Sequence, residues 1–323
     1  MENILADFLV RRPEGYYCRY GDFFVDPVLP VRQAVVSHAH ADHATPGHQQ
    51  IYCTSPTAAF MQYRYNRQSV DSFATFTYRQ VFEIGGVTLY FISAGHMLGS
   101  AQVVMEYRGI RYLYTGDYKV QEDDTCEPLD VEQADVLITE STFADPQIVH
   151  PDPVAEICKI NAQPHHILLG TYALGKAQRL TSLINRYCPD RRVLLHHGIL
   201  PLHRLYGSFG MDHLVYEPYN RREMKSKDAH HVYLVPPMTF NSYFRATNVI
   251  RVFASGWKRL QQSNGMELYI SDHVDWNDIL MYVEQVNPRE IWTVHGDGTH
   301  LVSHFAGRRA VRPLTVDSQS VDR

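Results

Sequence analysis

The sequence predicts an α/β protein in which a β-rich domain is interrupted by a smaller α/β domain. Short runs of β-branched and aromatic residues, separated by glycines, dominate the first half of the chain. After Asp145 the pattern changes to alternating strands and helices, which is typical of a parallel α/β unit. A strand, a helix and a final strand return near the end of the chain. We therefore expect one domain from residues 1–145 and 257–323, with residues 146–256 inserted as a second domain.

The elements of the first domain follow from its apolar runs and turn residues. A helix is expected over 55–67, because Ser55 suits the N-cap and Pro56 suits the first helical position. A second helix is expected over 276–286. The predicted strands are 16–20, 23–25, 34–37, 50–54, 76–82, 87–93, 101–107, 110–116, 136–139, 268–271 and 291–294.

The inserted domain has the rhythm of strand followed by helix. Its predicted strands are 166–169, 193–196, 231–235 and 249–253, and its predicted helices are 176–187 and 202–209. This alternation favours a small parallel sheet.

Composition narrows the class of protein. The chain has 323 residues, of which 45% are hydrophobic and 20% charged, as in an ordinary globular protein. A net charge of −5 without a basic run argues against a positive coat for nucleic acid. No apolar run approaches about 20 residues, and the start lacks a signal-peptide pattern. Five scattered cysteines indicate reduced thiols. We expect a cytoplasmic protein with no membrane partner.

The most informative motif is the segment 37–43, which reads SHAHADH and follows the apolar run 34–36. His38 and His40 are two residues apart on an extended segment, so their side chains point the same way and can bind one metal ion. Asp42 and His43 can reach a second ion nearby. Such two-metal sites suit attack by a bridging hydroxide on a phosphorus or carbonyl centre.

More ligand-type residues lie beyond the ends of other predicted strands. His96 follows one strand in SAGHMLGS, Asp117 follows the next-but-one in YTGDY, and His295 follows the last in TVHGDG. Each loop contains glycine. Side chains placed after several strands can converge at one edge of a sheet, so we expect these residues to complete two metal sites.

These motifs resemble those of the metallo-β-lactamase fold in its β-CASP nuclease branch, from Asp26 to His295. The resemblance adds an acidic residue, Glu140 in ITEST, a further histidine, His273 in ISDHVD, and a cap-helix opening in YALGKAQR at 172–179. It implies a four-layer αββα metallo-β-lactamase sandwich with an inserted β-CASP α/β cap domain.

The resemblance also implies a ligand set. One zinc ion would be held by His38, His40, His96 and Asp117, and a second by Asp42, His43, Asp117 and His295. Mn²⁺ or Fe²⁺ could occupy the same set. Asp26 would orient a ligand histidine, and the expected catalytic residues are Asp42, Glu140 and His273. A metal-bridging hydroxide would attack phosphorus, and His273, oriented and kept protonated by Glu140, would protonate the leaving 3′-oxygen.

The expected substrate contacts lie in and beside the cap. Lys176 begins a helix that can cradle a phosphate, although ordinary helix capping explains it equally well. Trp257 could stack on a base, and Lys258 and Arg259 could hold a backbone phosphate.

Within the branch, the segments GDYKVQEDDTCEP, TYALGKAQRL, FASGWKRL and SDHVDW resemble the bacterial ligase-associated exonucleases. That resemblance implies a DNA exonuclease in DNA repair, with DNA rather than RNA as the partner, and a DNA ligase and a helicase in the same pathway. His295 departs from the DNA-acting Artemis group, which usually has valine there, so an RNA-processing nuclease stays open. A small-molecule ester or thioester hydrolase is disfavoured by Glu140, His273 and the cap.

Overall fold

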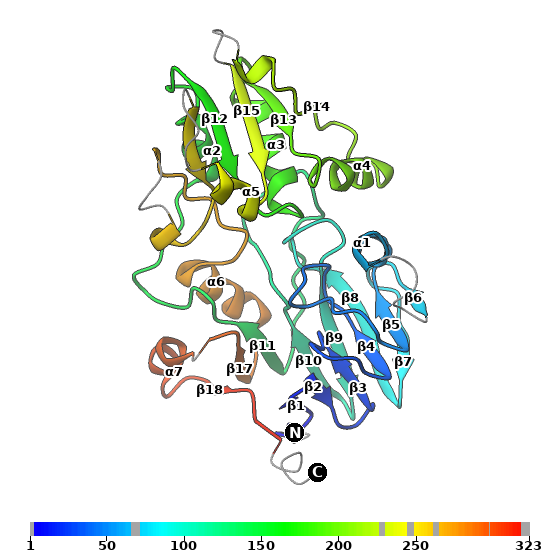
Figure 1. Cartoon of the computed structure of the whole chain (residues 1–323). Helices are drawn as coiled ribbons and strands as arrows, with labels where there is room; N and C mark the ends of the chain where they lie inside the picture. The colour runs from blue at the N-terminus through cyan, green and yellow to red at the C-terminus, as the bar shows by residue number, and fades with distance from the viewer. Residues whose placement is uncertain are drawn as a thin grey trace. The chain divides into compact units, whose positions relative to one another are not determined.

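The computed structural model describes residues 3–65, 72–225, 230–243, 249–260, 265–296 and 298–317. The chain divides into two compact units (Figure 1). The first unit consists of Met1–Glu122, Cys126–Val149 and His273–Arg323, and the second of Asp123–Thr125 and His150–Asp272.

The division differs from the expected domain boundaries at three places: residues 146–149 belong to the first unit, and residues 123–125 and 257–272 belong to the second. The segment 257–272 packs within the second unit. Leu268 and Ile270 are buried in its core, and the Tyr269 N–H donates to Glu156 Oε2 at 2.9 Å.

The first sheet of unit 1 is built from the N-terminal strands. Its order is β1 (Leu9–Arg12), β2 (Gly15–Cys18), β3 (Phe23–Val25), β4 (Gln33–Val35), β5 (Gln50–Cys53) and β6 (Phe73–Thr75). The β1, β2 and β3 pairings are antiparallel, whereas β3 to β6 run parallel.

The second sheet of unit 1 combines strands that are far apart in the sequence. Its order is β18 (Ala310–Pro313), β17 (Glu290–Val294), β11 (Val136–Glu140), β10 (Ile110–Tyr114), β9 (Ala101–Tyr107), β8 (Val87–Ser93) and β7 (Phe82–Ile84). Strands β10, β11, β17 and β18 are parallel, and β7 to β10 pair antiparallel.

Alternate side chains of these sheets supply different cores. In β11, Ile138 packs between the two sheets, whereas Leu137 packs against the helices α6 (Trp276–Val286) and α7 (Thr299–Phe305). In and beside β4, Val35 belongs to the core between the sheets, while Ala34 faces α1 (Ser55–Tyr65). Successive side chains of a strand point to opposite faces of its sheet. One face of each sheet therefore packs against the other sheet, and the opposite face packs against helices.

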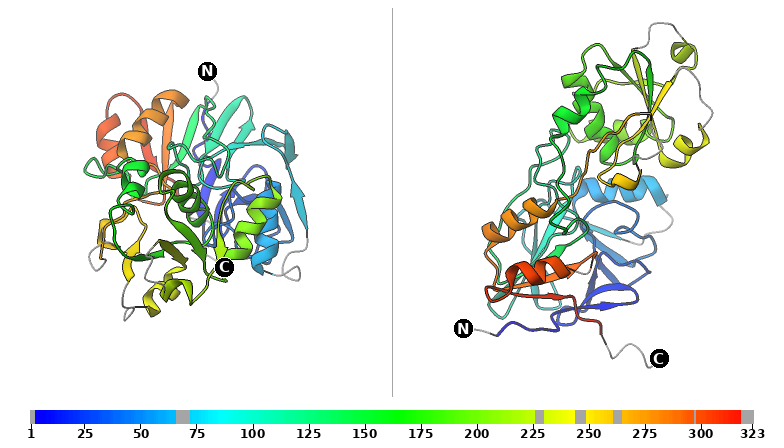
Figure 2. Two further views of the ribbon diagram at one scale, coloured as in Figure 1. Left: turned by 90° about the horizontal axis from the view of Figure 1, so that it is seen from above. Right: turned by 90° about the vertical axis from the view of Figure 1, so that its left-hand side faces the viewer.

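The predicted four-layer αββα sandwich is therefore confirmed. Both views in Figure 2 show α6 and α7, in orange to red, beside each other and on the side of their sheet away from the blue N-terminal strands. The cap expected within this fold is the second unit.

The second unit is built around a parallel sheet. Its order is β14 (Glu217–Pro218), β13 (Arg192–Leu195), β15 (His231–Val235), β12 (His166–Gly170) and β16 (Val249–Phe253). The helices of this unit are α2 (Pro153–Cys158), α3 (Lys176–Tyr187), α4 (Leu200–Ser208) and α5 (Pro237–Ser242), with 3-10 turns η1 (Glu223–Lys225) and η2 (Lys258–Leu260).

Two predicted strands are wrong. The stretch 76–82 is mostly a loop between β6 and β7. The rings of Phe76 and Phe82 stack with centroids 3.9 Å apart, whereas a continuous strand would separate these two residues by about 20 Å. The stretch 268–271 forms only a single bridge, between Leu268 and Ala254. Among the described residues, no helix combines the length and apolar composition that a membrane crossing needs.

The core between the two sheets gives the first testable prediction. Ile138 is fully buried there, so Ile138→Ala should lower the free energy of unfolding by about 2–5 kcal/mol. Denaturant unfolding followed by circular dichroism measures this change. Val81, which is 62% exposed, is the matched control, and Val81→Ala should leave the midpoint nearly unchanged.

Candidate metal centre

Strand direction explains why the candidate residues meet. Strands β10, β11 and β17 are mutually parallel, and β8 runs the same way because β9 is antiparallel to both β8 and β10. The carboxyl ends of these strands therefore lie at one edge of the sheet. His96 follows β8, Asp117 follows β10, Glu140 ends β11 and His295 follows β17.

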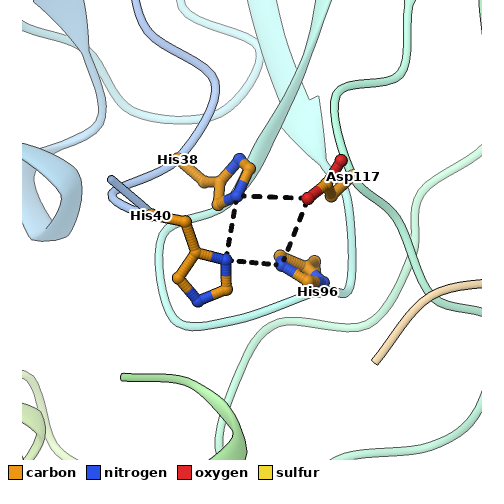
Figure 3. A group of neighbouring side chains, drawn as sticks. All are labelled: His38, His40, His96 and Asp117. Carbon is orange, nitrogen blue, oxygen red and sulfur yellow. Dashed lines mark hydrogen bonds and ion pairs between the residues drawn. The ribbon is translucent and has the colours of Figure 1, made fainter. Parts of the chain in front are cut away.

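The first cluster consists of His38, His40, His96 and Asp117, whose side chains point toward one another (Figure 3). His40 Nδ1 lies 3.1 Å from His38 Nε2 and 3.1 Å from His96 Nε2. Asp117 Oδ2 lies 3.6 Å from His38 Nε2 and 3.9 Å from His96 Nε2. One ligand atom of each residue lies within 4.8 Å of all the others.

The second cluster shares the same carboxylate and consists of His43, Asp117 and His295. His43 Nε2 lies 3.4 Å from Asp117 Oδ2, and the rings of His43 and His295 have centroids 5.2 Å apart. His295 itself is exposed and has φ of +52°. Asp117 therefore stands between both clusters and is the candidate bridging ligand.

The donor set of the first cluster fits a metal ion. His40 Nδ1 faces two other imidazole nitrogens, and a proton on His40 can serve only one of them at a time. A cation among these nitrogens would satisfy all of their lone pairs, and imidazole nitrogen with carboxylate oxygen suits Zn²⁺. His38 and His96 are 1% and 2% exposed, so little water is available to do the same.

Burial and neighbouring charges shift the pKa values of the clustered residues in different directions. Burial, and then His43, lower the pKa of His38 well below its usual value, which keeps this imidazole neutral. Burial alone would raise the pKa of Asp117, but His43 and His273 beside it hold that pKa well below its usual range. Burial opposes charge on His43, yet Asp117 and Asp26 raise the pKa of His43 well above its usual value. The site thus holds a buried carboxylate that attracts positive charge.

Asp26 anchors ligands of both clusters. Its Oδ2 accepts from His43 Nδ1 at 2.8 Å, from Ser37 Oγ at 2.6 Å and from the Tyr114 hydroxyl at 2.9 Å, while its Oδ1 accepts from the Ser37 N–H at 2.7 Å. Ser37 Oγ in turn lies 3.0 Å from His38 Nδ1. A proton on Nδ1 of each histidine leaves its Nε2 lone pair free for a metal.

The turn before Asp117 depends on a glycine. Gly116 has φ of +55°, and a Cβ at this position would lie 2.9 Å from Ser37 Oγ. The close approach allows Ser37 to hold Asp26 and His38 directly beside the Asp117 loop.

His273 and Glu140 form a pair next to the first cluster. Glu140 is fully buried and accepts from the Tyr118 N–H at 3.1 Å. His273 Nδ1 lies 3.0 Å from Glu140 Oε2 and 4.0 Å from Asp117 Oδ2, and the rings of His273 and His96 have centroids 5.1 Å apart. Its side chain is 28% exposed. The Nδ1 side of the imidazole is thus engaged by the carboxylates of Glu140 and Asp117.

Asp42, predicted as a ligand, lies beside the second cluster without joining the set of converging side chains. Its side chain is 76% exposed, and its Oδ2 lies 3.8 Å from His43 Nε2. The described ligand groups contain Asp117 and His295 on this side, but not Asp42. An exposed carboxylate is stabilised by water, and His43 is the residue of the second cluster beside it.

Lys176 has a structural role in place of the expected phosphate contact. It is 5% exposed, its Nζ donates to Ile270 O at 2.9 Å, and it lies 3.7 Å from Asp272 Oδ2. The neighbouring Arg179, 1% exposed, donates to Ser271 O at 2.6 Å and to Asp272 Oδ1 at 3.0 Å. These cations therefore fix the segment 270–272 within the second unit.

The other expected substrate residues lie on the surface of the second unit. Trp257, Lys258 and Arg259 are exposed in or beside η2. The Arg259 guanidinium lies 4.9 Å from the centroid of the Trp257 ring. An exposed ring with an adjacent cation can contact nucleic acid.

Sequence reasoning missed several residues that support the ligand loops. Ser37 and Tyr114 hold Asp26, Arg64 Nη1 donates to Ala39 O at 2.6 Å, and Lys119 Nζ donates to His96 O at 3.3 Å. Ser37 directly precedes His38 of the histidine motif, and this position in the sequence could have marked it as a supporting residue. The others come from distant segments, and no local pattern marks them.

Comparisons with known proteins agree with this centre. A family model described as "Zn-dependent metallo-hydrolase RNA specificity domain" matches residues 268–306. The chain is 33% identical over 320 residues to a protein of Opitutus terrae named "Probable DNA ligase", and the alignment covers 93% of this chain and 30% of that relative. It is 30% identical over 214 residues to an "RNase J-like protein" of Methanocaldococcus jannaschii, covering 57% of this chain and 49% of that relative.

This chain thus spans less than half the length of either relative. Among solved structures, a protein of unknown function from Enterococcus faecalis V583 matches with a TM-score of 0.58, covering 87% of this chain and 79% of that chain. The identity is 14%, so this likeness shows a shared fold alone.

The hydrogen bonds of Asp26 give a second testable prediction. Asp26→Asn keeps the shape of the side chain but removes the charge that orients His43 and, through Ser37, His38. The affinity for Zn²⁺ should fall by about 10–100-fold, measured by competition with a chromophoric chelator. Asp212 is exposed in the second unit, and Asp212→Asn should bind zinc like the wild type. Equal affinities for all three proteins would contradict the role of Asp26.

Proposed function

Because this chain belongs to the β-CASP branch of the metallo-β-lactamase family, we propose that it is a metal-dependent nuclease that shortens DNA from an end during DNA repair. The observation that carries the proposal is the convergence of three histidines on Asp117 beside the buried Glu140–His273 pair. A hydrolase for small esters needs the metal ligands but not this additional acid–base pair.

The chain's own residues can hold two metal ions. His38, His40, His96 and Asp117 would bind one, and His43, Asp117 and His295 would bind the other. Bound zinc ions supply Lewis-acid stabilisation of phosphate charge and make a water molecule more acidic. Asp26 orients His43 directly and His38 through Ser37 by bonds at the Nδ1 side, so that Nε2 of each imidazole would face a bound ion.

His273 acts as the general acid of the proposed reaction. Its Nδ1 is hydrogen-bonded to Glu140, and a proton on its Nε2 would pass to the 3′-oxygen that leaves when the phosphodiester bond breaks. Glu140 acts through His273 by fixing the orientation of the ring and by stabilising its positive charge. The complete burial of Glu140 strengthens both effects, because water does not compete for its oxygens.

The second unit supplies contacts to the strand. Trp257 is 37% exposed, and its ring can stack on a base, while the neighbouring Lys258 and Arg259 can pair with backbone phosphates. These few local cations suit a protein whose net charge is −5. The protein would then bind a single strand by stacking and a small number of phosphate contacts.

DNA is the preferred substrate class, and RNA is the second candidate. The relative named as a DNA ligase aligns with nearly the whole of this chain, which supports a role in repair together with a ligase. RNA is favoured by the relative named RNase J-like and by the description of the family model that matches residues 268–306.

The substrate assignment predicts the outcome of a degradation assay. Purified protein with Zn²⁺ or Mn²⁺ should shorten end-labelled single- or double-stranded DNA stepwise, producing a ladder on a denaturing gel. Chelation of the metal should stop the reaction. Cleavage of RNA with no cleavage of DNA would replace the repair function with the RNA-processing one.

The general-acid role predicts a separable effect at His273. His273→Ala should lower the single-turnover cleavage rate by about 10²–10⁴-fold, because the leaving oxygen loses its proton donor. The metal content, measured by plasma mass spectrometry, should stay at the wild-type value. His165 is exposed in the second unit and serves as control, since His165→Ala should cleave normally. An unchanged rate in His273→Ala would rule out this role.

A further inference from the structure

A cavity of about 750 Å³ borders the second metal cluster within the first unit. His43 and His295 form one of its walls, and Arg11 and Tyr16 of the β1–β2 hairpin form another. Sites for small ligands and cofactors usually measure about 300–1,000 Å³, so the space suits one nucleotide. Neither the ligand set nor the proposed general acid accounts for this cavity.

Arg11 offers a cation to this cavity. Within the described part of the chain, its guanidinium has no ion pair and no hydrogen bond. The adjacent Arg12 has its charge paired within the protein. Its Nε lies 2.8 Å from Asp317 Oδ2, and its guanidinium lies 3.7 Å from the centroid of the Tyr17 ring. The Arg11 backbone is held by its N–H, which donates to Thr315 O at 2.8 Å. Arg11 is thus an anchored residue with a charge that is free to bind an anion.

Tyr16 connects the Arg11 side of the cavity with the metal cluster. Its ring lies edge-on to His295 with centroids 6.1 Å apart, and it also contacts Tyr114 at 5.8 Å. Among the described residues, its hydroxyl has no hydrogen-bond partner. A phenol in this position can donate one hydrogen bond to a phosphate or sugar oxygen and present its ring to a base.

The remaining surface of the cavity is largely apolar. Val294 and Leu314 are buried, whereas Val28 and Val316, also in its lining, are 50% and 66% exposed. Apolar walls beside a cation and a phenol match the chemistry of a nucleotide, which combines a flat base with a phosphate. Three carboxylates also line the cavity, those of Asp26, Asp42 and Asp317. Asp26 is engaged by His43, Asp317 pairs with Arg12 and Arg19, and Asp42 is exposed, so an anion is favoured at the Arg11 side of the cavity.

We propose that this cavity binds the nucleotide next to the scissile phosphodiester, with Arg11 pairing with its phosphate and Tyr16 contacting its phosphate or sugar. The proposal rests on the nuclease function and adds a binding subsite to it. Arginine is suited to this task because its planar guanidinium can donate two parallel hydrogen bonds to phosphate oxygens.

Binding of a mononucleotide to metal-free protein tests the subsite without depending on catalysis. Isothermal titration in EDTA with 2′-deoxyadenosine 5′-monophosphate should show one saturable site, and 2′-deoxyadenosine, which lacks the phosphate, should bind at least about tenfold more weakly. Arg11→Gln should weaken nucleotide binding by about tenfold or more, and Tyr16→Phe by several-fold. Arg308 is exposed beyond α7, and Arg308→Gln should retain wild-type affinity.

Steady-state cleavage of a DNA oligonucleotide gives an independent measurement. With metal present, Arg11→Gln should raise KM by about tenfold while kcat changes little, since the phosphate contact exists before and during the reaction. The subsite is overturned if metal-free protein does not bind the mononucleotide, or if Arg11→Gln binds it as tightly as the wild type. Nucleotide binding that is lost in Arg11→Gln, together with no cleavage by the wild type, would support the subsite and reject the nuclease.

Discussion

A single carboxylate oxygen organises this protein's candidate centre. Asp117 Oδ2 lies 3.4 Å from His43 Nε2, 3.6 Å from His38 Nε2 and 3.9 Å from His96 Nε2, and Asp117 is only 6% exposed. A buried negative charge is costly unless positive charge lies beside it. In the metal-free protein the neighbouring imidazoles stabilise the negative charge of Asp117, and bound cations would stabilise it in their place. The direction of the strands makes this arrangement possible, because the carboxyl ends of parallel strands place the ligand residues at one edge of the sheet.

Asp26 makes the two clusters mechanically dependent on each other. It holds His43 directly and His38 through Ser37, and Tyr114 at the end of β10 holds Asp26 in turn. A shift of this carboxylate would therefore move ligands of both clusters at once. Its φ of +44° lies in the left-handed region, which aspartate tolerates better than most residues. This backbone conformation places the carboxylate of Asp26 where it can hold His43 and Ser37.

The two sides of the centre are suited to different tasks. The pair of His273 and Glu140 adjoins the first cluster through His96, whereas the cavity with Arg11 and Tyr16 adjoins the second cluster. In the proposed reaction, the leaving oxygen would therefore face the first cluster. The nucleotide that the cavity retains would face the second. This separation gives the strand a preferred direction across the centre, which is what an exonuclease needs.

The sequence by itself determined that an α/β unit interrupts a β-rich domain, and it placed the α-helices at 176–187 and 276–286. Those features are local, because they follow from amphipathic periods and turn residues. The four-layer arrangement and the set of candidate ligands came from the resemblance of the motifs to a known family. Only the tertiary structure decided that Lys176 is buried beside Asp272, that the Leu268 segment packs as irregular chain, and that Asp42 stays in solvent. These outcomes depend on partners many residues away, and burial or hydration of a charge is decided by such partners and not by its neighbours in the sequence.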